Sequence, residues 1–339
     1  MRSTLSPSSG VVDVGGWVAP AMELVYEQGT PEFRGQWPGI EAMLELAPLR
    51  AGDWDHPALE LPADAPRRAP DDAWAAPSSA RVATGVLHDN PAGRVAALDA
   101  AGVDLPLLSP GPSIDACLRL PSNLAAGVFA AYNRYVVDYC AGSSHRLGAV
   151  LQLHGSEPRW SAHELGELAG EPSVRAASLC LAVRIAPDDR QFEPLWEALE
   201  RSGLPLLHRP SFCARVWSPG RLLAYLRGAG VLDRHPTLRV ALLPGESERS
   251  AADLRSCIER VASRAEDLGA RLFGVATAAQ LQRGCDDGRG MLWASDFPLC
   301  GELRPVLART RELLGASGGS VLEIHPRRFL GVRRPAGAP

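Results

Sequence analysis

Residues 192–208, with the sequence FEPLWEALERSGLPLLH, contain one complete helix–strand unit of the fold. Leu195, Trp196 and Leu199 recur at helical spacing, so they predict a helix with one apolar face. Gly203 follows, and glycine commonly ends a helix because it readily adopts the left-handed backbone conformation. The next five residues, LPLLH, are apolar without alternation, which is typical of a strand buried on both faces. The stretch therefore predicts a helix packed against a parallel sheet.

The same unit of helix, glycine and short apolar strand repeats along the chain from Asn90 onward. The count of strands favours a closed barrel over an open sheet, and no glycine-rich GxGxxG motif follows the first strand. We therefore predict an α/β fold, a single (β/α)8 TIM-type barrel. The clear strands are expected at residues 11–14, 103–110, 147–153, 177–185, 204–208, 238–243 and 291–296, with a doubtful one at 270–275.

The barrel is expected to span residues 11–332 and to carry one long insertion. Residues 23–79 contain many prolines, which oppose long helices, so we expect them to form an irregular cap. The cap contains Trp37, Trp54 and Trp74, which either line a substrate pocket or cover one end of the barrel. Residues 333–339 are expected to form a flexible tail.

Composition excludes several classes of protein. The net charge is −4, and the sequence has no cluster of arginines of the kind that binds nucleic acid. The chain has no lysine, which removes Schiff-base enzymes, P-loop NTPases and sites with a carbamylated lysine. The 7 cysteines include no CxxC pair, and no apolar run approaches the ~20 residues of a membrane span. We expect a cytoplasmic protein with reduced thiols that binds no membrane.

Polar residues follow the predicted strands at their carboxyl ends, where TIM-type barrels carry their chemistry. Several of these residues are candidates for acid–base or binding roles, although each also has a purely structural interpretation as a capping, core or surface residue. The candidates for catalysis are Asp296, His208, His154 and Glu246, and the candidates for substrate binding are Arg184 and Trp17.

Five stretches carry a family resemblance through their order and spacing. They are ALDAAGVDLPLLS at residues 97–109, AYNRYVVDYC…RL at 131–147, residues 192–208, LDRHPTLRVALL at 232–243 and MLWASDFP at 291–298. The chain thereby resembles the amidohydrolase-related branch (family 2) of the metal-dependent amidohydrolase superfamily. That branch includes aminocarboxymuconate-semialdehyde decarboxylase and γ-resorcylate decarboxylase.

The resemblance implies a divalent ion, often zinc, held at the ends of the first, fifth and last strands. His208 and Asp296 match the fifth and last positions, but the first-strand pair falls on Gly15 and Trp17. The resemblance also implies an acidic residue or a histidine after the sixth strand. In this chain that position falls at Pro244, and Glu246 lies two residues further along. We therefore expect no cofactor, unless other ligands such as His154 or Asp13 rebuild a site for zinc or another divalent metal.

Without an ion, we expect the ring of Trp17 in or beside the space that the ion would fill. His208 and Asp296 would then hydrogen-bond directly or through a water. Arg184 would bind a substrate carboxylate, since arginine suits such contacts.

Three functions remain open. The first is an amidohydrolase-like lyase, cyclase or hydrolase that acts without a metal, by acid–base chemistry, on a small cyclic or carboxylated metabolite. The second is a pseudoenzyme that binds a ligand or stabilises an active homologous subunit. The third is a metal-dependent hydrolase or decarboxylase with relocated ligands. We also expect a homodimer, or a heterodimer with a homologous subunit, because of the resemblance and the tryptophan-bearing insertion.

Overall fold

The structure is a computed structural model, and it describes residues 10–46 and 90–332 apart from short gaps. The gaps are residues 19, 21, 111–113, 115–116, 182–184, 209–216, 245–249, 264–267, 285–287 and 299.

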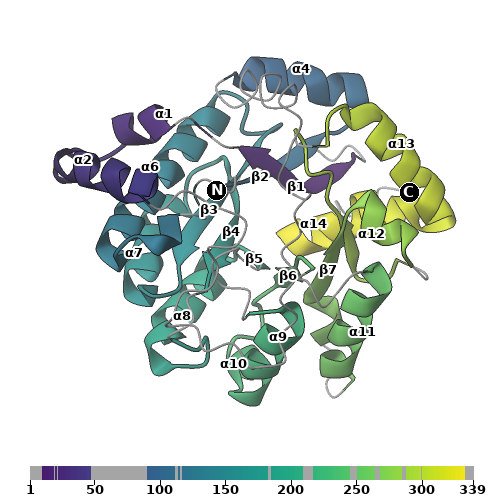
Figure 1. The fold of residues 1–339 in the computed structure, drawn as a ribbon. Helices are drawn as coiled ribbons and strands as arrows, with labels where there is room; N and C mark the ends of the chain where they lie inside the picture. The colour runs from purple at the N-terminus through teal and green to yellow at the C-terminus, as the bar shows by residue number, and fades with distance from the viewer. Residues whose placement is uncertain are drawn as a thin grey trace.

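Eight strands form one parallel sheet in the order β1 to β8, and helices surround it as in a TIM barrel (Figure 1). The predicted fold class is confirmed. The strands are β1 Val12–Val18, β2 Leu105–Pro110, β3 Gly148–His154, β4 Val174–Cys180, β5 Leu206–His208, β6 Val240–Leu242, β7 Leu272–Ala276 and β8 Met291–Trp293.

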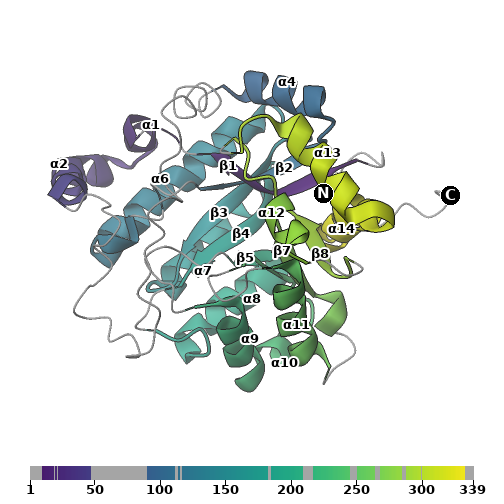
Figure 2. The same ribbon diagram turned by 45° about the vertical axis from the view of Figure 1, so that its right-hand side comes forward.

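Helices connect successive strands and cover the outside of the barrel (Figure 2). Their apolar faces recur every three to four residues, so each presents one buried stripe to the strands. The main helices after the insertion are α4 Pro91–Ala101, α6 Ser122–Ala141, α7 Pro158–Leu168, α8 Glu193–Ser202, α9 Pro219–Gly228, α10 Val231–Arg234, α11 Ala251–Ala262, α12 Ala278–Gln282, α13 Leu303–Leu314 and α14 His325–Leu330.

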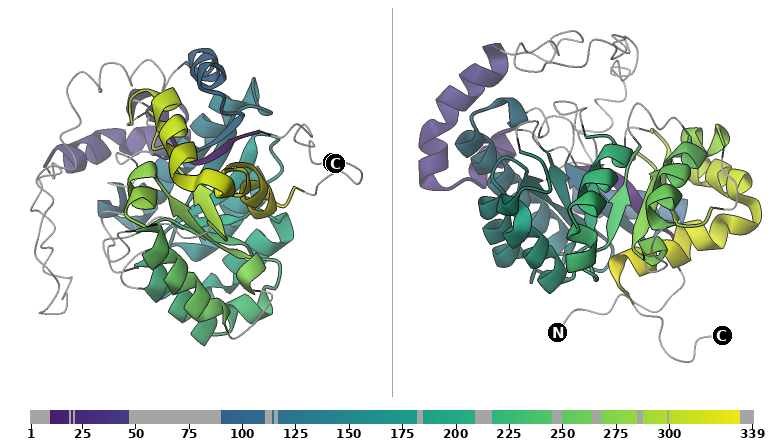
Figure 3. Two further views of the ribbon diagram at one scale, coloured as in Figure 1. Left: turned by 90° about the vertical axis from the view of Figure 1, so that its right-hand side faces the viewer. Right: turned by 90° about the horizontal axis from the view of Figure 1, so that it is seen from below.

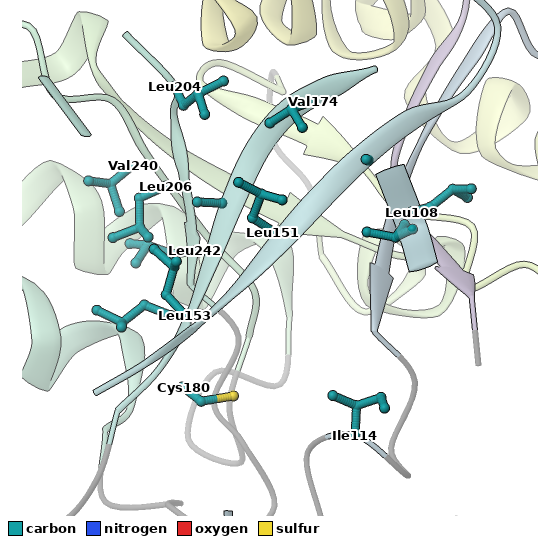
Figure 4. Close-up of a cluster of buried hydrophobic side chains, with 14 of the residues drawn as sticks. Leu108, Ile114, Leu151, Leu153, Val174, Cys180, Leu204, Leu206, Val240 and Leu242 are labelled. Atoms are coloured by element: carbon teal, nitrogen blue, oxygen red, sulfur yellow. The ribbon is translucent and has the colours of Figure 1, made fainter. Parts of the chain in front are cut away.

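The core has two layers because strand side chains alternate between the two faces of the sheet. One layer fills the barrel interior and includes Val150, Leu207 and Phe273. The other lies between strands and helices, where Leu151 and Leu153 of β3 pack near Leu206 of β5 (Figure 4). This alternation determines which side chains of each strand face the interior of the barrel.

Strands β1 and β8 meet through side chains as well as backbone. The N–H group of Trp17 donates to the carbonyl of Phe297 at 2.9 Å. The Asp13 carboxylate accepts from the Ser295 N–H at 2.9 Å and from the Ser295 hydroxyl at 2.5 Å. We call this contact between the two strands the seam.

Two predictions about the amino-terminal part are wrong. Residues 22–46 are not irregular: they form α1 Met22–Glu27 and α2 Pro31–Leu46, which lie outside α6 (Figures 1 and 3). Pro31 occupies the first helical position, where proline is tolerated, and Phe33, Trp37 and Ile40 form a buried helical stripe. The rest of the predicted cap, including Trp54 and Trp74, lies outside the described residues.

The second wrong prediction concerns the end of the first strand. Strand β1 continues through Gly15 and Gly16 to Val18 instead of ending at Val14. The doubtful strand is confirmed as β7. None of the helices in the described part of the chain is long and apolar enough to cross a membrane.

Candidate functional site

Asp296 follows β8 with a left-handed backbone, which residues other than glycine seldom adopt, although Asp and Asn do so more often than most. Its φ is 58°, and it is the non-glycine residue with a positive φ among the residues described. This left-handed conformation costs about 1–2 kcal/mol for an ordinary residue, and such strain clusters at functional sites. Trp17 Nε1–H donates to Asp296 Oδ1 at 3.3 Å, so the two predicted candidates lie together. Both side chains are only half-buried, which leaves the pair accessible.

Arg94 of α4 contacts the backbone of Trp17 and is not among the candidates of the sequence analysis. It is fully buried, its Nη2–H donates to the carbonyl of Trp17 at 2.9 Å, and its Nε–H donates to the Tyr139 hydroxyl at 3.0 Å. Its guanidinium also lies 5.7 Å from the centre of the Phe297 ring. The spacing of four residues from the buried Leu98 places Arg94 on the inner face of α4, and that signal was available in the sequence.

Asp13 lies beneath the pair at the seam and is completely buried. Its Oδ1 accepts from the N–H groups of Gly15 at 3.0 Å and Ser295 at 2.9 Å, and its Oδ2 accepts from the Ser295 hydroxyl. Burial raises the pKa of Asp13 to about 6, against the lowering effect of these hydrogen bonds, and the charge of Asp296 raises it further. Burial and the same two carboxylates raise the pKa of the nearby Cys300 thiol to about 12.

His208 ends β5 and is buried. Its Nε2–H donates to the carbonyl of Trp217 at 2.9 Å, and its Nδ1 has no partner. Burial lowers the pKa of His208 to about 4, so the ring is neutral at neutral pH. A direct hydrogen bond between His208 and Asp296 is not formed, since His208 Nε2–H donates to the backbone of Trp217 and Asp296 accepts from the indole of Trp17. The expected link through a water stays a prediction.

His154 ends β3 and is also buried. Its Nδ1 accepts from the N–H of Ser156 at 3.1 Å, and its ring lies 5.4 Å from that of Phe129 on α6. Its Nε2 has no partner, and burial lowers the pKa of His154 to about 4. The remaining two candidates, Arg184 and Glu246, lie outside the described residues.

No protein-family model matches the chain, and no curated protein does. Solved structures do share the fold. The 5-carboxyvanillate decarboxylase of Sphingomonas paucimobilis is 16% identical, with a TM-score of 0.62 over 96% of this chain and 100% of its own. A 5-carboxyvanillate decarboxylase of Novosphingobium aromaticivorans, crystallised with manganese and 4-hydroxy-3-methoxy-5-nitrobenzoic acid, is 15% identical, with a TM-score of 0.62 over 97% and 98%. An amidohydrolase of Mycobacterium avium subsp. paratuberculosis K-10 is 17% identical, with a TM-score of 0.60 over 74% and 76%.

The prediction of no cofactor is wrong for this fold, because the Novosphingobium decarboxylase holds manganese. The residues of this chain can be tested against such an ion. A Cβ atom on Gly15 would lie 2.3 Å from the Cβ of Ala294, so a ligating side chain does not fit there without a shift. Trp17 presents an N–H donor and no lone pair for a metal. Of the positions that the resemblance implies, only His208, through its unpartnered Nδ1, and the Asp296 carboxylate could act as ligands, and zinc sites use three or four protein ligands.

Within the described residues, no three His, Cys, Asp or Glu side chains converge on one point. These residues therefore do not fit the ligand set that the resemblance implies, and no catalytic step is assigned to an ion. The chain shares its barrel with decarboxylases and an amidohydrolase, as the resemblance predicted, and departs from the family pattern at the end of β1.

Proposed function

We propose that this protein is an amidohydrolase-fold enzyme that acts on carboxylated aromatic compounds, with decarboxylation as the reaction. The observation that carries the proposal is the strained Asp296 at the carboxyl end of the barrel, held by the indole of Trp17. Support for the substrate class comes from the 5-carboxyvanillate decarboxylases that share the fold. The remaining barrel-end groups, His154 and His208, are neutral and support binding more than proton transfer.

In this proposal Asp296 is the general acid. Loss of CO2 breaks the bond between the ring and its carboxylate, and the electron pair stays on the ring carbon. A proton then forms the new C–H bond, and the Asp296 carboxyl group delivers it and is reprotonated by solvent. Trp17 is a positioning residue, because its N–H fixes the carboxyl group through Oδ1.

The test is decarboxylation of 5-carboxyvanillate and 2,6-dihydroxybenzoate, followed by chromatography of the products. Each substrate is assayed with added manganese and with a chelator, since a relative of the same fold holds that ion. Asp296→Asn is the decisive variant, because asparagine tolerates the left-handed backbone but cannot transfer the proton. We expect a rate loss of about 100-fold or more, which is the usual contribution of a general acid.

Trp17→Phe is the matched control, since it keeps an aromatic ring and removes the indole N–H together with part of the ring system. We expect a smaller loss, about 10-fold, because the carboxyl group is less well oriented. The proposal fails if neither substrate is consumed in either arm, or if Asp296→Asn retains the wild-type rate while folded.

Two further expectations stay predictions. These are the assembly as a homodimer or a heterodimer with a homologous subunit, and the cytoplasmic location. Light scattering of the purified protein at micromolar concentration tests the first of them.

A further inference from the structure

Two polar side chains share the inner face of β3 near its carboxyl end. Alternation along the strand places Gln152 and His154 on the same face as Val150, which packs in the barrel interior. Both side chains are at least 98% buried. Each keeps one polar atom without a partner: Gln152 Oε1 and His154 Nε2.

The amide of Gln152 is fixed in one orientation. Its Nε2–H2 group donates to the carbonyl of Leu153 at 3.0 Å and to that of Ser178 at 3.3 Å, and it lies 3.0 Å from Cys180 Sγ. A flipped amide would place an acceptor against those two carbonyls, so the unpartnered atom is the acceptor oxygen. Asn133 of α6 adds rigidity, because it bonds both the N–H and the carbonyl of Gln152.

The ring of His154 is fixed in the same way. Its Nδ1 accepts from the N–H of Ser156, so the proton of the neutral ring is on Nε2. Ser161 of α7 holds the backbone on both sides of this residue, accepting from its N–H and donating to its carbonyl. The unpartnered atom of His154 is therefore a donor, and that of Gln152, two residues earlier on the same strand, is an acceptor.

We propose that Gln152 and His154 together bind a hydroxyl group on the aromatic ring of the substrate and so select hydroxylated over unsubstituted arene carboxylates. The hydroxyl would donate to Gln152 Oε1 and accept from His154 Nε2–H. This inference rests on the proposed function and assigns two specificity residues to it.

The chemistry of the pair favours a hydroxyl over other groups. A carboxylate offers no donor to Gln152 Oε1, and His154 brings no charge to balance it, because burial keeps the ring neutral. An ammonium offers no acceptor to His154 Nε2–H. A phenolic hydroxyl has one donor and acceptor lone pairs, so it satisfies both atoms at once.

The experiment measures binding by calorimetry, independently of turnover, with benzoate and with 2-, 3- and 4-hydroxybenzoate. We expect wild type to bind at least one hydroxybenzoate about ten-fold more tightly than benzoate, which corresponds to about one neutral hydrogen-bond pair. His154→Asn is the main variant, since its Oδ1 is placed to accept from Ser156 as Nδ1 does, whereas the Nε2 donor is lost. It should remove the preference and leave benzoate affinity within about two-fold.

Gln152→Met is a second variant that removes the acceptor at similar length, and it should also remove the preference. Ser109→Ala is the matched control. Ser109 of β2 is a buried hydroxyl without a partner, and the pairing of Leu107 with Gly148 places it deeper, opposite Val150. This variant should keep the preference.

Three results overturn the inference. The first is equal affinity of wild type for benzoate and every hydroxybenzoate, which leaves the proposed function standing. The second is an unchanged preference in both variants of β3. The third is no binding of any of the four ligands, which overturns this inference and leaves the proposed function to the decarboxylation assay.

Discussion

The seam between β1 and β8 and the inner face of β3 both bury polar groups near the carboxyl end of the barrel, but they pair them differently. At the seam, the two oxygens of Asp13 accept three hydrogen bonds within the chain. On β3, Gln152 and His154 use their other polar atoms for the backbone and leave one atom each without a partner. An unpaired buried polar atom costs about 1–3 kcal/mol. The paired carboxylate of Asp13 therefore indicates a structural role, whereas an unpaired donor beside an unpaired acceptor on one strand suits a ligand that satisfies both.

The largest effect is expected from Asp13→Ala, which breaks the seam. The change leaves two backbone N–H groups and the Ser295 hydroxyl without their acceptor inside the barrel. We expect the free energy of unfolding to fall by about 4 kcal/mol, from the cost of several unpaired buried donors. Urea unfolding measures this, and a loss below about 1 kcal/mol would show that the seam is not structural.

The pH dependence of stability also tests the role of Asp13 at the seam. The pKa of Asp13 rises from its ordinary value of 3.8 to about 6 in the folded protein, so folding favours its protonated form. Its contribution to stability is fully present below pH 3.8 and declines as pH rises from there to about 6, by about 3 kcal/mol. The neighbouring ionisable groups are Asp296, whose charge raises the pKa of Asp13, and Cys300, whose pKa of about 12 keeps its thiol protonated in this range.

Asp13→Asn isolates that decline, because the amide oxygen can still accept from Gly15 and Ser295 and the amide nitrogen can donate to Ser295 Oγ. Between pH 4 and 7, wild type should lose stability relative to this variant in urea titrations. A constant difference across that range would contradict the raised pKa.

Gly15→Ala tests the packing at the seam. The added Cβ would lie 2.3 Å from the Cβ of Ala294, and overpacking of this kind costs about 2 kcal/mol. Ala294→Gly in the same chain should restore most of the loss. A double-mutant cycle with no coupling between the two positions would argue against their direct contact.

The smallest effect is expected from removing a hydroxyl that has no partner. Ser109→Ala should change the free energy of unfolding by less than about 0.5 kcal/mol. Ser161→Ala should cost about 1.5 kcal/mol, because its hydroxyl bonds both the N–H and the carbonyl of His154. Equal losses in the two variants would remove the distinction between paired and unpaired groups.

The barrel could be predicted from the sequence because its signal is local and repeated. The unit at residues 192–208 recurs often enough to give eight strands, including the doubtful one at β7. The helix α2 was not predicted because residues 23–79 contain many prolines, which oppose long helices, although Pro31 occupies the first position of this helix. The extension of β1 was missed because Gly15 and Gly16 were interpreted as its end.

The site was harder to predict, since it depends on contacts between distant segments. The contact of Trp17 with Asp296 joins residues 279 positions apart, and it follows from barrel closure. The expected pairing of His208 with Asp296 depends on side-chain direction at the end of β5, which the spacing along the chain does not determine. Gln152 had a usable signal, because it is a polar residue at an inward position of an apolar strand.

Hydrogen–deuterium exchange on the aromatic ring tests the role of Asp296 most directly. Vanillate, the product expected from 5-carboxyvanillate, is incubated with the protein in D2O, and NMR follows the ring hydrogen beside the hydroxyl. We expect catalysed exchange by wild type and a rate at least about 100-fold lower for folded Asp296→Asn. Exchange at the same rate in both proteins would contradict the assignment of Asp296 as the proton-transferring group.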